Sequence, residues 1–123
     1  MPTELKSLSL SQMKRLFRAL DVAVDELGPN LPPRQLMALL AVAIANRSDE
    51  PIGVRDIDYK LGDLHSGSAS KLLRSMMHVE TERKPGVANT VRSERDPHDL
   101  RKYNLELTPK GIEAVAKIVA ALG

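Results

Sequence analysis

Residues 96–111 read DPHDLRKYNLELTPKG, and they carry the clearest structural pattern in the sequence. It opens with acidic and basic residues around a proline, which is typical of an exposed turn. From Tyr103 to Leu107 apolar residues alternate with polar ones, as in a strand with one buried face. Thr108 is a good helix N-cap, and Pro109 suits the first helical position, where no backbone N–H is needed. The stretch therefore predicts the charged tip of a β-hairpin, its return strand and the start of a helix.

The outgoing strand of this hairpin is expected directly after Lys84-Pro85-Gly86, which interrupts regular structure. Val87–Arg92 alternate with period two, which predicts a strand, and Ser93–Leu100 would then form the loop. After the return strand, apolar residues recur at helical spacing up to Leu122. We therefore expect a charged hairpin followed by a terminal helix over residues 109–122.

Two short helices are predicted before the hairpin. Val54–Leu61 forms the first, and Gly62 is placed to end it. The second begins at Ser66 or Ser68 and continues to about Met77. A helix, a glycine-containing turn and a second helix form the outline of a helix-turn-helix.

The second of these helices has one apolar and one polar face. Its inward set is Ala69, Leu72, Leu73 and Met76, and its outward set is Ser66, Gly67, Ser68, Ser70, Lys71, Arg74 and Ser75. Small hydroxyl side chains allow another molecule to approach closely, and Lys71 and Arg74 can contact phosphates or guanine edges. The outward face therefore fits a helix that lies in a DNA groove; the alternative is an amphipathic helix that faces water.

Two longer helices open the chain, over residues 9–27 and 33–46. The apolar side of the first packs either in the chain's own core or in a dimer seam; its residues are Met13, Leu16, Phe17, Leu20, Val24 and Leu27. The second is apolar nearly all round, so we expect a central helix with protein on every side. Pro51-Ile52-Gly53 follows as a minimal strand. Together the elements predict a mainly α fold with a small β-hairpin (α+β), a winged helix-turn-helix.

The length of 123 residues predicts one compact domain. Within it we expect a dimerisation helix in residues 1–30, the winged helix-turn-helix in 31–108 and a second dimerisation helix in 109–123.

The composition argues against several classes of function. Cysteine is absent, which excludes disulfides and thiolate metal sites, and the three histidines lack partners at metal-ligand spacing. No nucleophile elbow and no phosphate-cradling Gly-rich loop occurs, and no carboxylate has neighbours that would raise its pKa. We therefore expect no enzyme, no metal and no cofactor.

The charge distribution permits a polyanionic partner. The sequence pI is about 9.0, and residues 60–110 hold ten Lys or Arg against seven Asp or Glu. The longest apolar run, LMALLAVAIA at residues 36–45, is too short to span a membrane. The N-terminus lacks the pattern of a signal peptide, so a cytoplasmic location is expected.

The wing-to-helix stretch resembles the signature of the MarR family, in which Asp-x-Arg at the wing tip precedes Leu-Thr-x-x-Gly at the next helix. Asp99 and Arg101 match the first part, and Leu107, Thr108 and Gly111 match the second. Upstream, VRDIDYKLGDLHSGSASKLLRSM is similar to the helix-turn-helix of that family. The resemblance covers roughly residues 30–123.

By this resemblance the protein would be a homodimeric regulator, a repressor of transcription that binds double-stranded DNA. Residues 66–77 would enter the major groove, and Arg101 a neighbouring minor groove, where narrow A·T-rich sequence attracts an extended guanidinium. Asp99 is too acidic to face phosphates, so we expect it to hold Arg101 or Arg95 in place. The expected DNA contacts are Ser66, Ser68, Ser70, Lys71 and Arg74 on the helix and Arg92, Arg95, Arg101 and Lys102 on the wing.

The dimer interface is expected on the terminal helices, at Leu16, Leu20, Val24, Leu27, Val115, Val119 and Leu122. Pockets for small molecules in the family are often lined by aromatic residues, which are scarce here, so we expect no effector. Two other functions fit the same sequence: a winged helix that binds another protein, or a plasmid or phage accessory protein that binds DNA for partition or replication.

Overall fold

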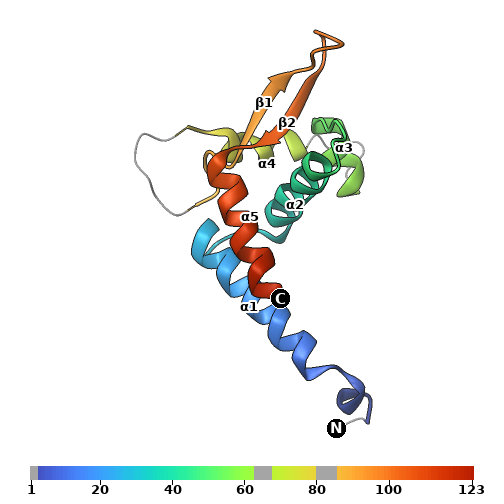
Figure 1. Ribbon diagram of the computed structural model, residues 1–123, viewed down its shortest axis with the longest axis vertical. Helices are drawn as coiled ribbons and strands as arrows, with labels where there is room; N and C mark the ends of the chain where they lie inside the picture. Colours follow the sequence, from blue (N-terminus) through green and yellow to red (C-terminus); the bar gives the residue numbers. More distant parts are fainter. Residues whose placement is uncertain (1–2, 63–67, 80–85) are drawn as a thin grey trace.

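Five α-helices and one β-hairpin make up the part of the chain that the computed structural model describes, residues 3–62, 68–79 and 86–123 (Figure 1). In chain order the elements are the 3-10 helix η1 (Thr3–Ser7), α1 (Leu10–Leu27), α2 (Pro33–Arg47), α3 (Val54–Lys60), α4 (Ser68–Met77), β1 (Val91–Arg95), β2 (Tyr103–Leu107) and α5 (Pro109–Leu122). β1 and β2 pair antiparallel. The expected mainly α fold with a small hairpin is confirmed.

Side-chain caps fix where two of the helices begin. Ser9 Oγ accepts the N–H of Gln12 at 3.3 Å at the start of α1. Thr108 Oγ1 accepts the N–H of Gly111 at 3.1 Å at the start of α5. Each bond satisfies a backbone donor that the first turn of a helix leaves without a partner. The Thr108 cap agrees with the sequence-based expectation.

α2 is the central element of the core, in contact with α3, α4, α5 and β2. Leu39 and Val42 on α2 are fully buried. The expectation of protein on every side is nevertheless wrong, because Met37 is 51% exposed and Ile44 is 66% exposed. α3 has only 7 residues, so it covers only part of this side of α2.

The first strand of the hairpin lies four residues later than the sequence pattern predicts. The alternation over Val87–Arg92 predicted a strand there, but β1 spans Val91–Arg95. Asn89 has a φ of 59°, in the left-handed region that interrupts a strand. Thr90 Oγ1 donates to the carbonyl of Val87 at 2.7 Å and closes a turn. The return strand β2 lies where it was expected.

Asn46, at the end of α2, ties the hairpin to the body of the protein. Its Nδ2 donates to the Leu105 carbonyl at 3.1 Å, and its Oδ1 accepts the Leu107 N–H at 2.9 Å. The Leu105 N–H donates to the Ile52 carbonyl at 2.8 Å. Residues 51–53, the expected minimal strand, thus supply one ladder bond without forming a regular strand. These bonds occupy the edge of β2 that faces away from β1.

Gly111 is required by a close approach of two backbones. A Cβ at this position would lie 2.1 Å from the carbonyl oxygen of Thr90, in the turn before β1. The Thr108 N–H also donates to that carbonyl at 3.1 Å, which holds it against the start of α5. The Leu-Thr-x-x-Gly motif therefore has a structural cause: its threonine caps α5, and its glycine leaves room for the turn.

Gly111→Ala is expected to lower the free energy of unfolding by about 2 kcal/mol, because the obstacle is backbone that no side-chain rotation can relieve. This loss outweighs the better helix propensity of alanine, about 1 kcal/mol. Urea unfolding measures the difference. Ile112→Ala, at the neighbouring exposed position, is the control and should change stability by less than about 0.5 kcal/mol. Equal stability of Gly111→Ala and wild type would contradict the close approach.

The second half of α1 packs against α5, and its first half extends beyond the body of the protein (Figure 1). Glu26 and Lys117 form an ion pair between the two helices at 3.2 Å. Leu27 is only 4% exposed because it packs in the chain's own core, so its assignment to a dimer interface is wrong. Val115 is half-buried, and the remaining residues expected at the interface are exposed: Leu16, Leu20, Val24, Val119 and Leu122.

Candidate nucleic-acid interface

The start of α4 is fixed by a side chain of α3. Asp58 Oδ1 accepts the N–H of Ala69, in the first turn of α4, at 3.0 Å. A carboxylate at a helix N-terminus satisfies a free donor and interacts favourably with the helix dipole. Ala69, Leu73 and Met76 are fully buried, as the sequence predicts, so α4 presents its other side to solvent.

The outward face of α4 carries exposed cations. Ser70, Lys71 and Arg74 are exposed, and within the described residues Lys71 and Arg74 form no ion pair. Ser75 is also exposed, but its Oγ accepts the Gln35 Nε2 hydrogen at 2.7 Å, which links α4 to α2. Of the expected contacts on this helix, Ser66 lies outside the described residues, as does the side chain of Ser68.

The wing tip presents one extended guanidinium. The Arg101 side chain is 93% exposed, and its Nε lies 3.4 Å from Asp99 Oδ1. The same carboxylate oxygen accepts the backbone N–H of Arg101 at 3.1 Å. Asp99 thus contacts Arg101 rather than Arg95, the other partner that the sequence allowed.

The cations of the wing do not converge on one face. Side chains alternate along a strand, so Arg92 and Arg95 of β1 point to opposite faces of the hairpin. Arg92 lies 3.1 Å from Glu106, its cross-strand partner, and 3.5 Å from Glu94. On the opposite face, Arg95 stacks on the Tyr103 ring, with its guanidinium carbon 5.5 Å from the ring centroid. The carboxylates around Arg92 make its face a poor match for phosphates, whereas Arg95 forms no ion pair within the described residues.

α4 and the wing belong to the same end of the molecule. The Thr90 N–H donates to the Met76 carbonyl at 2.9 Å, which joins the end of α4 to the turn that leads into β1. The hairpin projects away from the body, at the end opposite the first half of α1, with α3 and α4 at its base (Figure 1). A ligand that lies along α4 can therefore also meet the wing.

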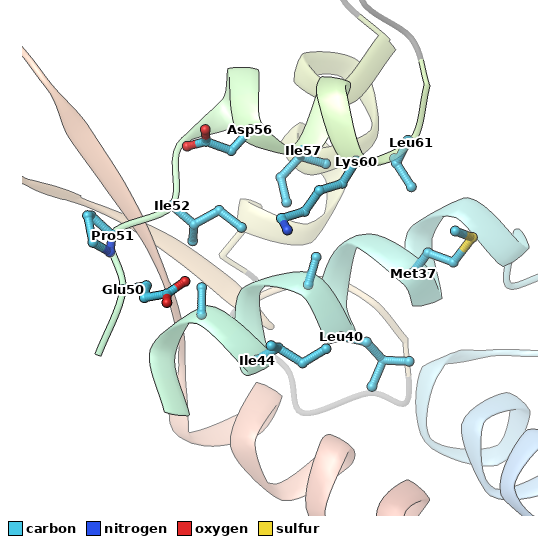
Figure 2. Close-up of a pocket in the computed structure, with 12 residues that line it drawn as sticks. Met37, Leu40, Ile44, Glu50, Pro51, Ile52, Asp56, Ile57, Lys60 and Leu61 are labelled. Atoms are coloured by element: carbon cyan, nitrogen blue, oxygen red, sulfur yellow. The ribbon is translucent and has the colours of Figure 1, made fainter. Parts of the chain in front are cut away.

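A cavity of about 460 Å³ lies between α2, α3 and the segment that precedes α3 (Figure 2). Its lining is mainly aliphatic and includes Met37, Leu40, Ile44, Ile57 and Leu61, with Glu50, Asp56 and Lys60 as the charged residues. The size falls within the usual range of small-molecule sites. Asp56 Oδ2 already accepts the N–H of Gly53 at 2.8 Å, as part of the cap of α3. The expected absence of an effector stays a prediction.

Four residues that position this surface were missed by sequence reasoning: Asn46, Asp58, Asp96 and Asn104. Asp96 had a local signal, because an Asp before a proline favours the start of a turn. The other three act on segments 8 to 61 positions away in the chain, and nothing in the sequence near them indicates those partners.

No helix among the described residues is both long and apolar enough to cross a membrane. In the same part of the chain, no group of three or more His, Asp or Glu side chains is placed to hold a metal ion.

Comparison with known proteins yields structural neighbours. No protein-family model and no curated protein matches the sequence. Two solved structures of S. aureus MepR, a MarR-family winged-helix regulator, do match the fold. One is MepR bound to ethidium bromide, with a TM-score of 0.60, 22% identity, and coverage of 94% of this chain and 76% of that chain. The other is a single-residue mutant of MepR, with a TM-score of 0.58 and the same identity and coverages. The chain therefore has the MarR-like winged helix-turn-helix fold that its wing-to-helix motif predicts.

Proposed function

We propose that this protein is a homodimeric, sequence-specific double-stranded DNA-binding protein that regulates transcription in the cytoplasm as a MarR-like repressor. α4 would lie in the major groove, with Ser70, Lys71 and Arg74 toward the bases and phosphates. The wing would place Arg101 in the adjacent minor groove. Repression would follow from occlusion of the promoter, without any enzymatic activity.

The observation that carries this proposal is the placement of exposed cations at one end of the molecule. Lys71 and Arg74 are exposed on α4 with no ion-pair partner among the described residues. Arg101 is 93% exposed at the tip of a hairpin whose base is bonded to the end of α4. Two such elements side by side suit a duplex, whose major and minor grooves alternate along one face.

A second copy of the chain is proposed as the partner at the other end of the molecule. Eight large apolar side chains at that end are 41–73% exposed. They are Leu10, Met13, Leu16, Phe17, Leu20 and Val24 on α1 and Val119 and Leu122 on α5. Contiguous apolar surface of this kind marks a protein-protein interface. A two-fold axis through it would set two α4 helices about one DNA turn apart, which fits an inverted-repeat site. In this proposal residues 1–30 and 109–123 are the dimerisation regions.

Selection of bound duplexes from a random pool, followed by affinity measurements over a range of salt, tests the proposal. Lys71→Ala, Arg74→Ala and Arg101→Ala should each weaken binding of the selected duplex by about tenfold. Removing a cation that contacts phosphate should also make the plot of log affinity against log salt shallower by about 0.9 per contact.

Arg18→Ala is the matched control, because Arg18 is an exposed cation in the first half of α1. That half of the helix extends away from α4 and the wing (Figure 1). The variant should bind the selected duplex with an affinity close to that of wild type. If no duplex is enriched, or if all three interface variants bind as Arg18→Ala does, the DNA-binding proposal fails. Weak retention of any duplex regardless of sequence would favour a protein-interaction module instead.

A further inference from the structure

We propose that Asp96, together with Asn104, is the positioning device that orients Arg101 for DNA, so that the wing tip is set before binding. This inference rests on the proposed function, and it deepens the role of the same surface. Asp96 itself would not touch the nucleic acid. It would act through the backbone of the tip and through Asp99.

The Asp96 carboxylate organises the tip through three hydrogen bonds. Its Oδ1 accepts the N–H of His98 at 2.7 Å and the N–H of Asp99 at 3.1 Å. Its Oδ2 accepts the side-chain amide of Asn104, on β2, at 3.0 Å. The backbone of the tip is closed by a further hydrogen bond, which the Asp96 N–H donates to the Lys102 carbonyl at 2.9 Å. One half-buried side chain thus joins both sides of the tip.

The ionised state of this carboxyl favours the arrangement. The backbone N–H of His98 and the amide of Asn104 lower the pKa of Asp96 below its ordinary value. The carboxyl is ionised at neutral pH, and because its pKa is lowered in the folded protein, its contribution to stability is lost only as the pH falls through that lowered value. The three donors therefore meet a full negative charge under the conditions in which the protein would bind DNA.

From Asp96 the arrangement continues to Arg101 through Asp99. Because Asp96 holds the Asp99 N–H, the backbone at Asp99 is fixed, and the Lys102 N–H donates to the Asp99 carbonyl at 2.9 Å. The Asp99 side chain then accepts from both the backbone and the Nε of Arg101. The Asp96 carboxylate therefore positions Asp99, and the Asp99 carboxylate contacts the guanidinium of Arg101.

An ordered wing tip is needed because few other contacts fix the position of the Arg101 side chain. At 93% exposure its side chain lacks packing, and an exposed ion pair with Asp99 alone is weak. A long side chain on an unfixed loop would lose much conformational freedom on binding, whereas a loop ordered beforehand loses less. The geometry at Asp96 removes part of this cost in advance.

Asp96→Ala is expected to weaken binding of the selected duplex on the order of tenfold, although Arg101 is intact. The decisive measurement is the same substitution in an Arg101→Ala background. If Asp96 acts through Arg101, Asp96→Ala should weaken binding there by less than twofold, a coupling that double-mutant analysis isolates. Equal losses in both backgrounds would overturn the inference, because Asp96 would then act independently of Arg101.

A second experiment exchanges donor and acceptor. Asn104→Asp places two carboxylates against each other and should weaken binding on the order of tenfold or more. Adding Asp96→Asn restores a carboxylate-amide pair with the direction reversed and the wild-type net charge, and it leaves an amide oxygen to accept the two backbone N–H groups. The double variant should recover most of the affinity. Failure to recover would count against the inference.

Thermal unfolding of each variant separates these effects from misfolding, and Asn104→Ala serves as a milder variant if Asp96→Ala proves unstable. Asn104→Ala should also weaken binding severalfold in the wild-type background, and not in the Arg101→Ala background. The outcomes distinguish the two proposals. If Arg101→Ala binds as wild type, the groove assignment fails; if Arg101→Ala weakens binding while the Asp96 and Asn104 variants do not, only the positioning role fails.

Discussion

Asn46→Ala is expected to lower the free energy of unfolding by about 2–4 kcal/mol, one of the two largest effects anticipated for a single substitution in this protein. The side chain bonds two backbone groups of β2, the Leu105 carbonyl and the Leu107 N–H, and both bonds are part-buried. Alanine leaves both groups without their partners, and each unsatisfied buried group costs about 1–3 kcal/mol. Calorimetry should show a fall in Tm on the order of 10 °C.

Arg47→Ala, one residue further along α2, is the control because Arg47 is exposed. Its stability should stay within about 0.5 kcal/mol of wild type. Asn46→Asp should fall between the two, since a carboxylate still accepts from Leu107 but meets the Leu105 carbonyl with a negative charge. If Asn46→Ala unfolds at the same temperature as Arg47→Ala, the hairpin is not tied to α2 in solution.

Leu20→Asp is expected to convert the proposed dimer into a monomer. Leu20 is 46% exposed in the single chain, near the middle of the open apolar side of α1, so it contributes little to the chain's own core. A carboxylate buried in an apolar interface is costly to desolvate, and the loss of dimer affinity should exceed about a hundredfold. Light scattering after gel filtration should then give the 13.5 kDa chain mass instead of twice that value.

Ser11→Asp provides a matched control on the same helix. Ser11 and Leu20 are nine positions apart, which is two and a half helical turns, so the two side chains lie on opposite sides of α1. Ser11 is exposed, and its substitution adds the same single charge. The control should remain dimeric. A wild-type chain that is monomeric at micromolar concentration, or a Leu20→Asp chain with the mass of a dimer, would contradict the proposed interface.

The helices could be predicted from the sequence because their signals are local. Ser9 and Thr108 are caps next to the residues they cap, and the apolar periodicity of α4 separates a buried from an exposed face. The sequence did not show whether the apolar side of α1 packs in the core or in a dimer interface, because the side that packs in the core consists largely of alanines. Ala19 and Ala23 pack within the chain, while Leu20 between them stays exposed.

The hairpin was only half predictable, for a physical reason. Alternation over residues 87–92 is compatible with a strand, but Asn89 adopts a left-handed conformation that asparagine tolerates well, and residues 87–90 have no partner strand. Register follows from pairing, which links Val91 to Leu107 across the hairpin. A period-two pattern in one segment does not indicate which residues of another segment it faces.

The cations of the candidate interface could be predicted from the sequence, but the residues that hold the interface in position could not. Lys71, Arg74 and Arg101 are polar residues in a pattern that exposes them, so their location follows from local structure. Arg92 was grouped with them because its pairing with Glu106 depends on the strand register. Asp58 and Asn104 were overlooked because their bonds go to segments that only the fold brings near. Asp96 was overlooked although its bonds to His98 and Asp99 are local.

The bonds from Asn46 and Ile52 to β2 have a mechanical consequence. A hairpin bonded along one edge to the central helix of the core cannot move independently of it, so the protruding arm and the body behave as one stiff unit. A partner molecule whose shape does not match this unit must itself deform. For a duplex, the energy of bending or twisting then depends on its base steps, and discrimination would extend to positions that no side chain reaches.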